Sequence, residues 1–254
     1  MSNTTALSVN LNKIALIRNS REGDYPSIVK HAQICLDAGA EGITVHPRPD
    51  QRHIRPADVF DLAKLVAPIQ GIEFNVEGNP FAGPQEGYPG FMQLIEQTRP
   101  DQATLVPDSD DQLTSDHGFD LTKTSDKLKP IIDQLHAWGC RVSLFMDPDV
   151  EQIKLAKAIG ADRIELYTGP YAAAYRQRSD DLDKLFEQYY RAGEAAAELG
   201  LGLNAGHDLD LDNLGRFRKV PNLLEVSIGH ALTVDSIAMG MSEAVKRYHH
   251  ICQN

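Results

Sequence analysis

The sequence predicts an α/β fold, a single (β/α)8 barrel over residues 1–254, and three observations support this prediction. Eight short β-rich runs occur along the chain, longer helical patterns separate them, and several helices end in a glycine that leads into the next strand. Eight such units close naturally into a TIM barrel. An open doubly wound sheet is the alternative, but the eight units and the missing glycine fingerprint of a dinucleotide fold disfavour it.

The eight predicted strands are short and rich in apolar residues. We interpret most of them as continuous apolar runs, which is typical of strands that are buried on both faces. In chain order they are Ala6–Leu11, Gly42–His46, Glu73–Glu77, Gln102–Val106, Arg141–Met146, Arg163–Tyr167, Leu201–Asn204 and Leu224–Ile228.

Helical periodicity fills the longer intervals between the strands. We expect helices at Ile28–Ala38, Leu128–Trp138, Val150–Ile159 and Leu182–Leu199. Four joints between a helix and a strand read AGAEGITV, WGCRVSLF, IGADRIEL and LGLGLN. Glycine after a helix is the usual left-handed stop, so each phrase indicates a helix end followed at once by a strand.

Two long loops follow predicted strands. The segment Glu77–Gly90 is rich in Gly and Pro and is long for a loop between a strand and a helix. We therefore expect it to form a lid or a wall of an active site. The second loop, Pro107–Phe119, follows the fourth strand.

Charge and cysteine usage exclude several classes of function. The formal net charge is -11 and there is no Lys/Arg run, so a nucleic-acid partner is not expected. The three cysteines, Cys35, Cys140 and Cys252, show neither metal spacing nor a disulfide framework, which fits a reducing compartment. No apolar run approaches membrane-spanning length, and Met1–Leu7 does not resemble a signal peptide. We therefore predict a cytoplasmic enzyme with no membrane partner.

Polar residues gather at the predicted C-terminal strand ends, where barrel enzymes build their sites. Convergence of side chains from separate strands on one mouth is the strongest internal indication of an enzyme. The residues are Asn10, Asn12 and Lys13 on the first strand, His46, Arg48, Arg52 and His53 after the second, Asn75 and Glu77 on the third, Thr114 after the fourth, Glu165 and Tyr167 on the sixth, Asn204 and His207 at the seventh, and Gly229 and His230 after the eighth.

Each of these residues also has a structural interpretation. His46 could bond a loop carbonyl, Glu77 could cap a helix, and Glu165 could belong to an ion pair inside the barrel. Arg52 reads as a solvated loop charge. The group argues more strongly than any member, because unpaired charges at a barrel rim are costly unless they are used.

Phosphate groups have two candidate binding elements. The phrase VSIGHA, Val226–Ala231, places a glycine between a strand and a helix, where backbone N–H groups can approach an oxyanion. The other element is arginine, since Arg18, Arg21 and Arg48 follow the first two strands and guanidinium grips phosphate with two parallel bonds. Two such elements suit two phosphorylated substrates.

Glutamate and histidine together suit proton transfer, because histidine titrates near neutral pH and burial raises a glutamate toward it. A metal site of His46, Glu77, Glu165 and His207 is the rival interpretation, of the kind that metal-dependent sugar isomerases use. No sequential motif such as HExxH supports the metal site.

Seven phrases, in order and spanning Val9 to about Leu232, resemble the pyridoxine 5'-phosphate synthase family. They are VNLNKIALIRNSR, GITVHPRPDQRHI, FNVEGNP, RVSLFMDPD, RIELYTG, LNAGHDL and VSIGHAL. The resemblance implies a (β/α)8 barrel that assembles as a homo-octamer and needs no metal or organic cofactor. It also implies condensation of 1-deoxy-D-xylulose 5-phosphate with 3-amino-2-oxopropyl phosphate to pyridoxine 5'-phosphate, phosphate and water.

The resemblance assigns roles to individual residues. His46 and Glu77 match proton acceptors, His207 matches a proton donor, and Glu165 matches a carboxylate that supports the transition state. Asn10 and Arg21, with the backbone at Asp208, Gly229 and His230, match the site for the aminoketone phosphate. Arg48, His53 and Thr114, with Asn12 and Lys13, match the site for deoxyxylulose phosphate.

The chain departs from the family at three of these positions. Asn12 and Lys13 stand where the family usually has Asp-His, and Asp208 stands where it often has Gly. Two other functions therefore stay open. One is a metal-dependent sugar-phosphate isomerase or epimerase on the same barrel, and the other is a non-catalytic relative that binds phosphorylated metabolites.

Overall fold

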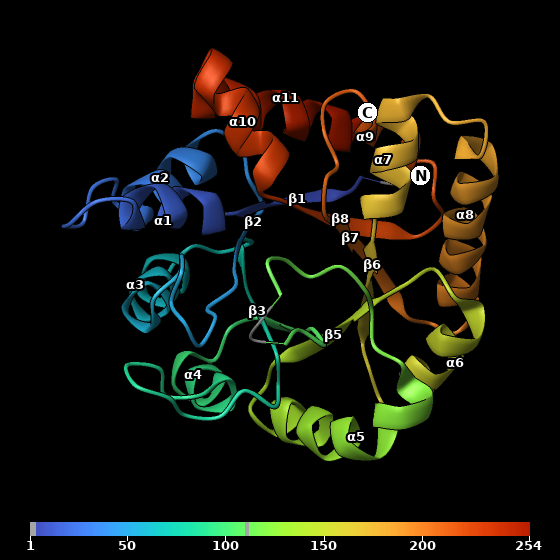
Figure 1. Cartoon of the computed structure of the whole chain (residues 1–254), viewed down its shortest axis with the longest axis horizontal. Helices are drawn as coiled ribbons and strands as arrows, with labels where there is room; N and C mark the ends of the chain where they lie inside the picture. Colours follow the sequence, from blue (N-terminus) through green and yellow to red (C-terminus); the bar gives the residue numbers. More distant parts are fainter. Residues whose placement is uncertain (1–3, 110–111) are drawn as a thin grey trace.

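The structure, a computed structural model, describes residues 4–109 and 112–254. The first three residues of Met1–Leu7 and two residues of the Pro107–Phe119 loop therefore lie outside the described residues. Eight parallel strands pair in chain order, and β1 pairs with β8, so the sheet closes into the predicted barrel (Figure 1). The strands are β1 Ala6–Asn10, β2 Gly42–Val45, β3 Glu73–Gly78, β4 Gln102–Leu105, β5 Arg141–Met146, β6 Arg163–Tyr167, β7 Gly202–Gly206 and β8 Leu223–Ile228.

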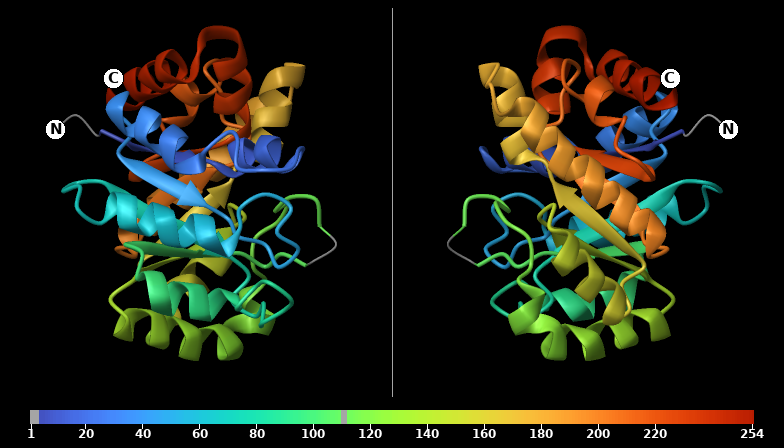
Figure 2. Two further views of the ribbon diagram at one scale, coloured as in Figure 1. Left: turned by 90° about the vertical axis from the view of Figure 1, so that its left-hand side faces the viewer. Right: turned by 90° about the vertical axis from the view of Figure 1, so that its right-hand side faces the viewer.

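Helices surround the barrel, as the two side views also show (Figure 2). The four predicted helices are all present, although α5 begins seven residues before the expected Leu128 because Asp120 caps its start through a hydrogen bond from the Thr122 N–H. The helix expected after the glycine of VSIGHA is also present, as α10. The bounds of all described helices are α1 Asn12–Asn19, α2 Ile28–Asp37, α3 Pro56–Val66, α4 Phe91–Thr98, α5 Leu121–Ala137, α6 Val150–Ala158, α7 Gly169–Gln177, α8 Leu182–Glu198, α9 Leu214–Phe217, α10 His230–Met239 and α11 Met241–Gln253.

The glycine joints take the conformation that the repeated phrases predict. Gly39, Gly139, Gly160 and Gly200 follow α2, α5, α6 and α8, and all four have φ between +63° and +105°. An L side chain adopts this left-handed region only at a cost, so glycine ends each helix and turns the chain into the next strand. The prediction of repeated joints is confirmed.

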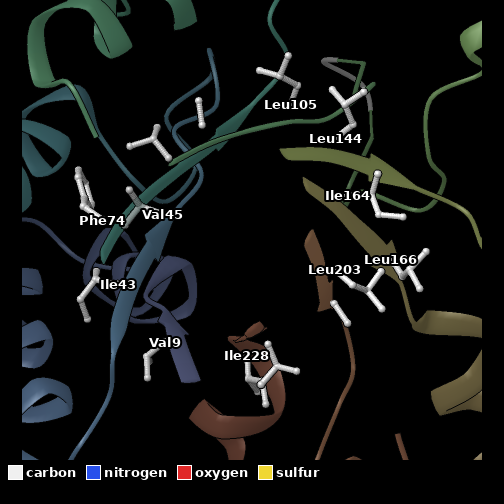
Figure 3. Packing of buried hydrophobic residues seen from close by; sticks show 14 of the residues in the cluster. Val9, Ile43, Val45, Phe74, Leu105, Leu144, Ile164, Leu166, Leu203 and Ile228 are labelled. Atoms are coloured by element: carbon white, nitrogen blue, oxygen red, sulfur yellow. The ribbon is translucent and has the colours of Figure 1, made fainter. Parts of the chain in front are cut away.

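The strands alternate in polarity, and the interpretation of them as continuous apolar runs is wrong. In β3, Phe74 and Val76 belong to the hydrophobic cluster, while Asn75 hydrogen-bonds the hydroxyls of Thr44 and Thr104. Both sets are buried, but the apolar set packs toward the helices and the polar set fills the barrel. Figure 3 shows apolar residues of this cluster contributed by strands all around the barrel.

Ion pairs occupy the end of the barrel opposite the polar strand ends described above. Arg163 Nη1 lies 3.2 Å from Glu225 Oε2 and also donates to Asn204 Oδ1, and Arg141 is paired with Glu73. Buried polar groups need such partners. The barrel interior is therefore held by a polar network, and that network leads up to the site at the other end.

The chain after β1 turns into a helix sooner than predicted. Asn12 and Lys13 form the first turn of α1 and are not part of the first strand. The Asn12 backbone N–H donates to Asn10 Oδ1 at 2.9 Å, which closes the turn between strand and helix.

Within the described residues, no helix combines the length and the apolar character that crossing a membrane requires.

Candidate active site

The C-terminal ends of the strands surround one cavity of about 350 Å³. Each of the eight strands, or the residue just after it, contributes to its wall. The lining comprises Asn10, Asn12, Lys13, Leu16, His46, Arg48, Arg52, His53, Glu77, Val106, Leu113, Thr114, Ser115, Phe145, Glu165, His207, Asp208, Ser227, Gly229 and His230. The prediction that polar groups of separate strands converge on one mouth is therefore confirmed, except that Asn75, Tyr167 and Asn204 do not line the cavity.

A larger surface depression, of about 880 Å³, lies between α7, α8 and the loop after β7. Arginine and aspartate side chains line most of it, and Arg176 pairs with Asp210 at 3.7 Å. It is open to solvent and lacks the histidine and glutamate groups of the barrel mouth. The smaller cavity is therefore the candidate active site.

His46 lies between two carboxylates. Its Nδ1 is 3.9 Å from Glu77 Oε2, and its Nε2 is 3.8 Å from Asp108 Oδ2. Burial, and then the positive charge of Arg48, lower the pKa of His46 well below its usual value. The imidazole is therefore neutral at physiological pH and can accept a proton, and the carboxyl group near either ring nitrogen can stabilise the imidazolium when that carboxyl group is ionised.

Glu77 holds its proton more tightly than an ordinary glutamate. Burial raises its pKa to about 8, and the charges of Asp108 and Glu225 add to the effect. Asn10 Nδ2 donates to Glu77 Oε2 at 3.4 Å, which links the end of β1 to the end of β3. A carboxyl group with its pKa near neutrality can exchange protons during turnover.

Glu165 does not belong to an ion pair inside the barrel, so that structural interpretation is wrong. Its side chain is 3% exposed, and Oε2 has no hydrogen-bond partner among the described residues. Burial, followed by the charges of Glu77 and Glu225, raises the pKa of Glu165 well above its usual value. An unsatisfied buried carboxyl facing a cavity is a group that a ligand can engage.

Gly206 leaves the space that Glu165 occupies, and this yields a prediction. A Cβ at Gly206 would lie 2.3 Å from Glu165 Oε1, so Gly206→Ala must push the carboxyl aside. We expect kcat to fall about 100-fold, because misplacement of a catalytic group by about 1 Å can cost that much. Thermal unfolding should barely change, since only the flexible end of Glu165 moves. Gly215→Ala is the matched control, because open space surrounds Gly215. Unchanged kcat in Gly206→Ala would show that the position of Glu165 does not matter.

The chain bends sharply at His207 and Asp208, which follow β7. Both residues are left-handed, with φ of +80° and +57°. The Thr168 hydroxyl secures this bend by donating to the carbonyls of Gly206, at 2.7 Å, and of His207. A left-handed position explains why glycine suits the place of Asp208, and aspartate tolerates it better than most residues do.

Aromatic rings hold the imidazole of His207. Tyr167 meets it edge-on with ring centroids 5.3 Å apart, and Phe145 lies at 5.8 Å. Burial lowers the pKa of His207. The ring is therefore neutral at physiological pH and must gain a proton before it can donate one.

The start of α10 offers backbone donors to an anion. Gly229 caps this ten-residue helix, no side chain bonds its first turn as a cap, and Gly229 and His230 both line the cavity. The first N–H groups of a helix bind phosphate readily. A Cβ at Gly229 would lie 3.1 Å from the Asn10 Cβ. A side chain at residue 229 would therefore crowd Asn10 at the end of β1.

Arg48 and His53 enter from the loop after β2. Arg48 is 5% exposed, and His53 has its pKa lowered to about 3 by burial and by the charges of Arg48 and Lys13. Thr114 faces them from the loop after β4. Together with Lys13 on α1, these groups form a second site in the same cavity that could bind a phosphate group through positive charge and hydrogen bonds.

Two predicted arginine ligands are not part of the cavity lining. Arg18 is buried and pairs with Asp58 at 2.5 Å, while its Nη2 donates to the His53 carbonyl at 3.0 Å. It therefore fixes the loop that carries Arg48 and His53, and the prediction that Arg18 binds phosphate is wrong.

Arg21 is exposed beyond the end of α1. Arg52 was expected to be solvated, yet it lines the cavity and donates to the Gln112 carbonyl at 2.8 Å.

The Gly/Pro-rich segment does not form the wall that its composition suggests. Glu77 and Gly78 complete β3, and none of the described residues 79–90 lines the cavity. The loop after β4 forms that wall instead, through Leu113, Thr114 and Ser115.

Sequence reasoning missed several residues of the site, above all Asp108. This buried carboxylate sits in the loop after β4 and contacts Arg48, Ser115 and His46. Its signal was available, because Asp108 comes two residues after the predicted strand Gln102–Val106. Phe145 and Ser227 also line the cavity and were not predicted.

The four proton-transfer candidates do not form the metal cluster of the rival interpretation. No three His, Cys, Asp or Glu side chains within the described ranges come together as a group that could hold a metal ion. His46 Nδ1 instead lies 3.9 Å from Glu77 Oε2.

Solved structures with the same architecture support the fold. The tryptophan synthase alpha chain from Legionella pneumophila superposes with a TM-score of 0.66 at 14% identity, covering 99% of this chain and 92% of that one. Thiamine phosphate pyrophosphorylase from Pyrococcus furiosus gives a TM-score of 0.59 at 13% identity, covering 99% and 96% of the two chains. At such low identity the likeness concerns the barrel alone.

Sequence comparison identifies much nearer relatives. The chain is 52% identical over 249 residues to pyridoxine 5'-phosphate synthase of Xylella fastidiosa strain 9a5c, which covers 98% of this chain and 95% of that protein. It is 54% identical over 247 residues to the enzyme of the same name from Xanthomonas campestris pv. campestris strain B100, which covers 96% and 95%. The family model described as pyridoxal phosphate biosynthesis protein PdxJ matches residues 7–254. The chain belongs to the PdxJ family.

Proposed function

We propose that the chain is a pyridoxine 5'-phosphate synthase. It condenses 1-deoxy-D-xylulose 5-phosphate with 3-amino-2-oxopropyl phosphate, and the products are pyridoxine 5'-phosphate, phosphate and water. One observation carries the proposal: in a member of the PdxJ family, two histidines and two buried glutamates share a 350 Å³ cavity with two places suited to phosphate.

The chemistry needs several acid and base groups around one pocket. The amine attacks a ketone, and the resulting carbinolamine loses water to give an imine. Phosphate then leaves with enolisation, and an aldol-type closure followed by dehydration gives the aromatic ring. Every step moves a proton, and each positioned acid or base contributes about 10²–10⁴-fold to the rate.

The proton-transfer roles go to the groups whose environment suits them. His46, neutral and flanked by carboxylates, is a proton acceptor. Glu77 is a second acceptor and must first lose its own proton. His207 donates a proton that it has taken up earlier in turnover, and Glu165 supports the charge that develops in the transition state.

Each of the two substrates is assigned to one of the two candidate phosphate sites in the cavity. The aminoketone phosphate binds Asn10 and the backbone at Asp208, Gly229 and His230. Deoxyxylulose phosphate binds a separate group of side chains, namely Asn12, Lys13, Arg48, His53 and Thr114. All of these residues line the cavity, which supports them as substrate ligands. Arg21 remains a proposed ligand of the aminoketone phosphate without such support, since it is exposed and is not part of the cavity lining.

A direct assay tests the proposed function. Protein stripped of metal by a chelator is mixed with both substrates, and pyridoxine 5'-phosphate and free phosphate are measured together. We expect both to appear in equal amounts, with no change when divalent metal is restored. If neither product forms and deoxyxylulose phosphate alone is isomerised only after metal is restored, the result would favour the metal-dependent isomerase or epimerase. Binding of both substrates without product would favour the non-catalytic relative.

The chain is also proposed to form a homo-oligomer, an octamer as in the family. Exposed apolar side chains support this proposal, since Ile17 on α1 and Val234 and Ile237 on α10 are 47%, 51% and 79% exposed. Helices α1 and α10 contact each other, so these residues belong to one region of the surface. Light scattering of the purified protein measures the assembly directly.

A further inference from the structure

The loop after β4 carries a buried carboxylate that does not itself line the cavity. Asp108 is 5% exposed, and its backbone carbonyl accepts a hydrogen bond from Asn79 Nδ2 at 2.7 Å. Its side chain lies directly behind two residues that do line the cavity, Arg48 and Ser115. Asp108 can therefore influence a ligand only through its neighbours.

One oxygen of Asp108 collects all the contacts. Oδ2 accepts from Arg48 Nη2 and from the Ser115 hydroxyl at 2.8 Å, and His46 Nε2 lies 3.8 Å away. Oδ1 is buried and has no hydrogen-bond partner among the described residues. A pair that served stability alone would be expected to satisfy both oxygens, because an unsatisfied buried acceptor is costly.

Arg48 is fixed at two points by the loop that it faces. Besides the ion pair with Asp108, its Nη1 donates to the Gln112 carbonyl at 3.3 Å. A free arginine side chain loses much rotational freedom when it grips a phosphate, and one already fixed loses less. The same bonds hold the chain that presents Thr114 and Ser115 to the cavity.

We propose that Asp108 is a positioning residue for the condensation, which fixes Arg48 and the loop after β4 in the arrangement that receives the sugar phosphate. This inference rests on the proposed function, in which Arg48 binds deoxyxylulose phosphate. Asp108 touches no substrate.

Charge alone predicts the opposite effect, and this makes the inference testable. A carboxylate beside a phosphate site repels the ligand and offsets the charge of Arg48. If that repulsion dominated, Asp108→Asn would tighten binding of deoxyxylulose phosphate. If positioning dominates, the same substitution weakens it, although asparagine has nearly the same size as aspartate.

The experiment is a double-mutant cycle in the complete protein with Asp108→Asn, Arg48→Gln and both together. We expect Asp108→Asn to raise the KM for deoxyxylulose phosphate about tenfold, as the loss of one preorganised charged contact would. The KM for the aminoketone phosphate should change less than about twofold, since its site lies at α10. Asp108→Asn should add nothing further in the Arg48→Gln background. Asp133→Asn is the matched control, because Asp133 is an exposed residue of α5 whose one ion pair within residues 4–109 and 112–254 is with Lys129.

An unchanged or lower KM for deoxyxylulose phosphate in Asp108→Asn overturns the inference. The inference is also overturned if Asp108→Asn changes this KM equally in the presence of Arg48 and in the Arg48→Gln background. If Arg48→Gln leaves the KM for deoxyxylulose phosphate unchanged, the assignment of Arg48 in the proposed function fails instead.

A second variant guards against a folding defect. Asp108→Glu keeps the charge and should stay within about threefold of the wild-type KM, because its carboxylate can still pair with Arg48. If the wild-type protein gives no product, calorimetry can measure the affinity of the same variants for inorganic phosphate. The differences in affinity among the variants still report the coupling between Asp108 and Arg48.

Discussion

His46→Ala should lower kcat at least about 100-fold, the loss that follows removal of a positioned general base. The imidazole is neutral because burial and the Arg48 charge lower its pKa, and both of its nitrogens face carboxylates at 3.8–3.9 Å. No other described side chain lies between Glu77 and Asp108 in this way. Steady-state rates of pyridoxine 5'-phosphate formation measure the effect.

The barrel should survive this substitution. The His46 backbone N–H donates to Asn12 Oδ1 at 2.9 Å, and alanine keeps that bond. Circular dichroism and thermal unfolding should therefore match the wild-type protein within a few degrees. His250→Ala, on the exposed face of α11, is the control. A wild-type rate in His46→Ala would remove the histidine from the mechanism.

Glu77→Gln should abolish most activity and at the same time stabilise the protein at alkaline pH. Glutamine keeps the shape and the acceptor for Asn10 but cannot take up a proton. Loss of this proton acceptor should lower kcat about 100-fold. The second effect follows from the pKa of Glu77, which burial raises to about 8.

The direction of the stability effect follows from proton counting. Below pH 4.5 both the folded and the unfolded chain carry the proton, so Glu77 has no influence on the free energy of unfolding. Between about pH 4.5 and 8 the unfolded chain loses the proton while the folded chain keeps it, and stability falls by about 1.4 kcal/mol per pH unit. Glu77→Gln removes this loss.

Thermal unfolding at two pH values measures the stability effect. The melting temperatures of Glu77→Gln and wild type should agree near pH 4.5, and the variant should be several degrees more stable at pH 8. Glu96→Gln, at an exposed position of α4, is the control. Equal melting temperatures at pH 8 would mean that burial does not raise the pKa of Glu77 in the folded protein.

Much of the barrel could be predicted from the sequence because its signals are local. Strand runs and glycine stops each depend on a few neighbouring residues, and every predicted strand is present within two residues of its expected ends. The polarity of the barrel interior was not recognised, although alternation is visible in EFNVEG and RIELY. Polar residues facing inward are unusual for a barrel core, which bulky branched residues commonly fill.

The site was predictable where one strand end supplies one ionisable group. His46, Glu77, Glu165 and His207 come together as expected, because parallel strands all present their C-terminal ends to the same mouth. Arg18 could not be judged in this way. Its partner Asp58 lies forty positions further along the chain, and only the packing of α1 against the loop before α3 brings them together.

A crystal structure of the protein soaked with pyridoxine 5'-phosphate tests the central claim most directly, namely that the barrel mouth carries the reaction. We expect the product phosphate to accept hydrogen bonds from the backbone at Gly229 and His230, at the start of α10. The pyridine ring should lie within reach of His46 and Glu77. Product bound only in the open depression between α7 and α8, with an empty barrel mouth, would contradict the claim.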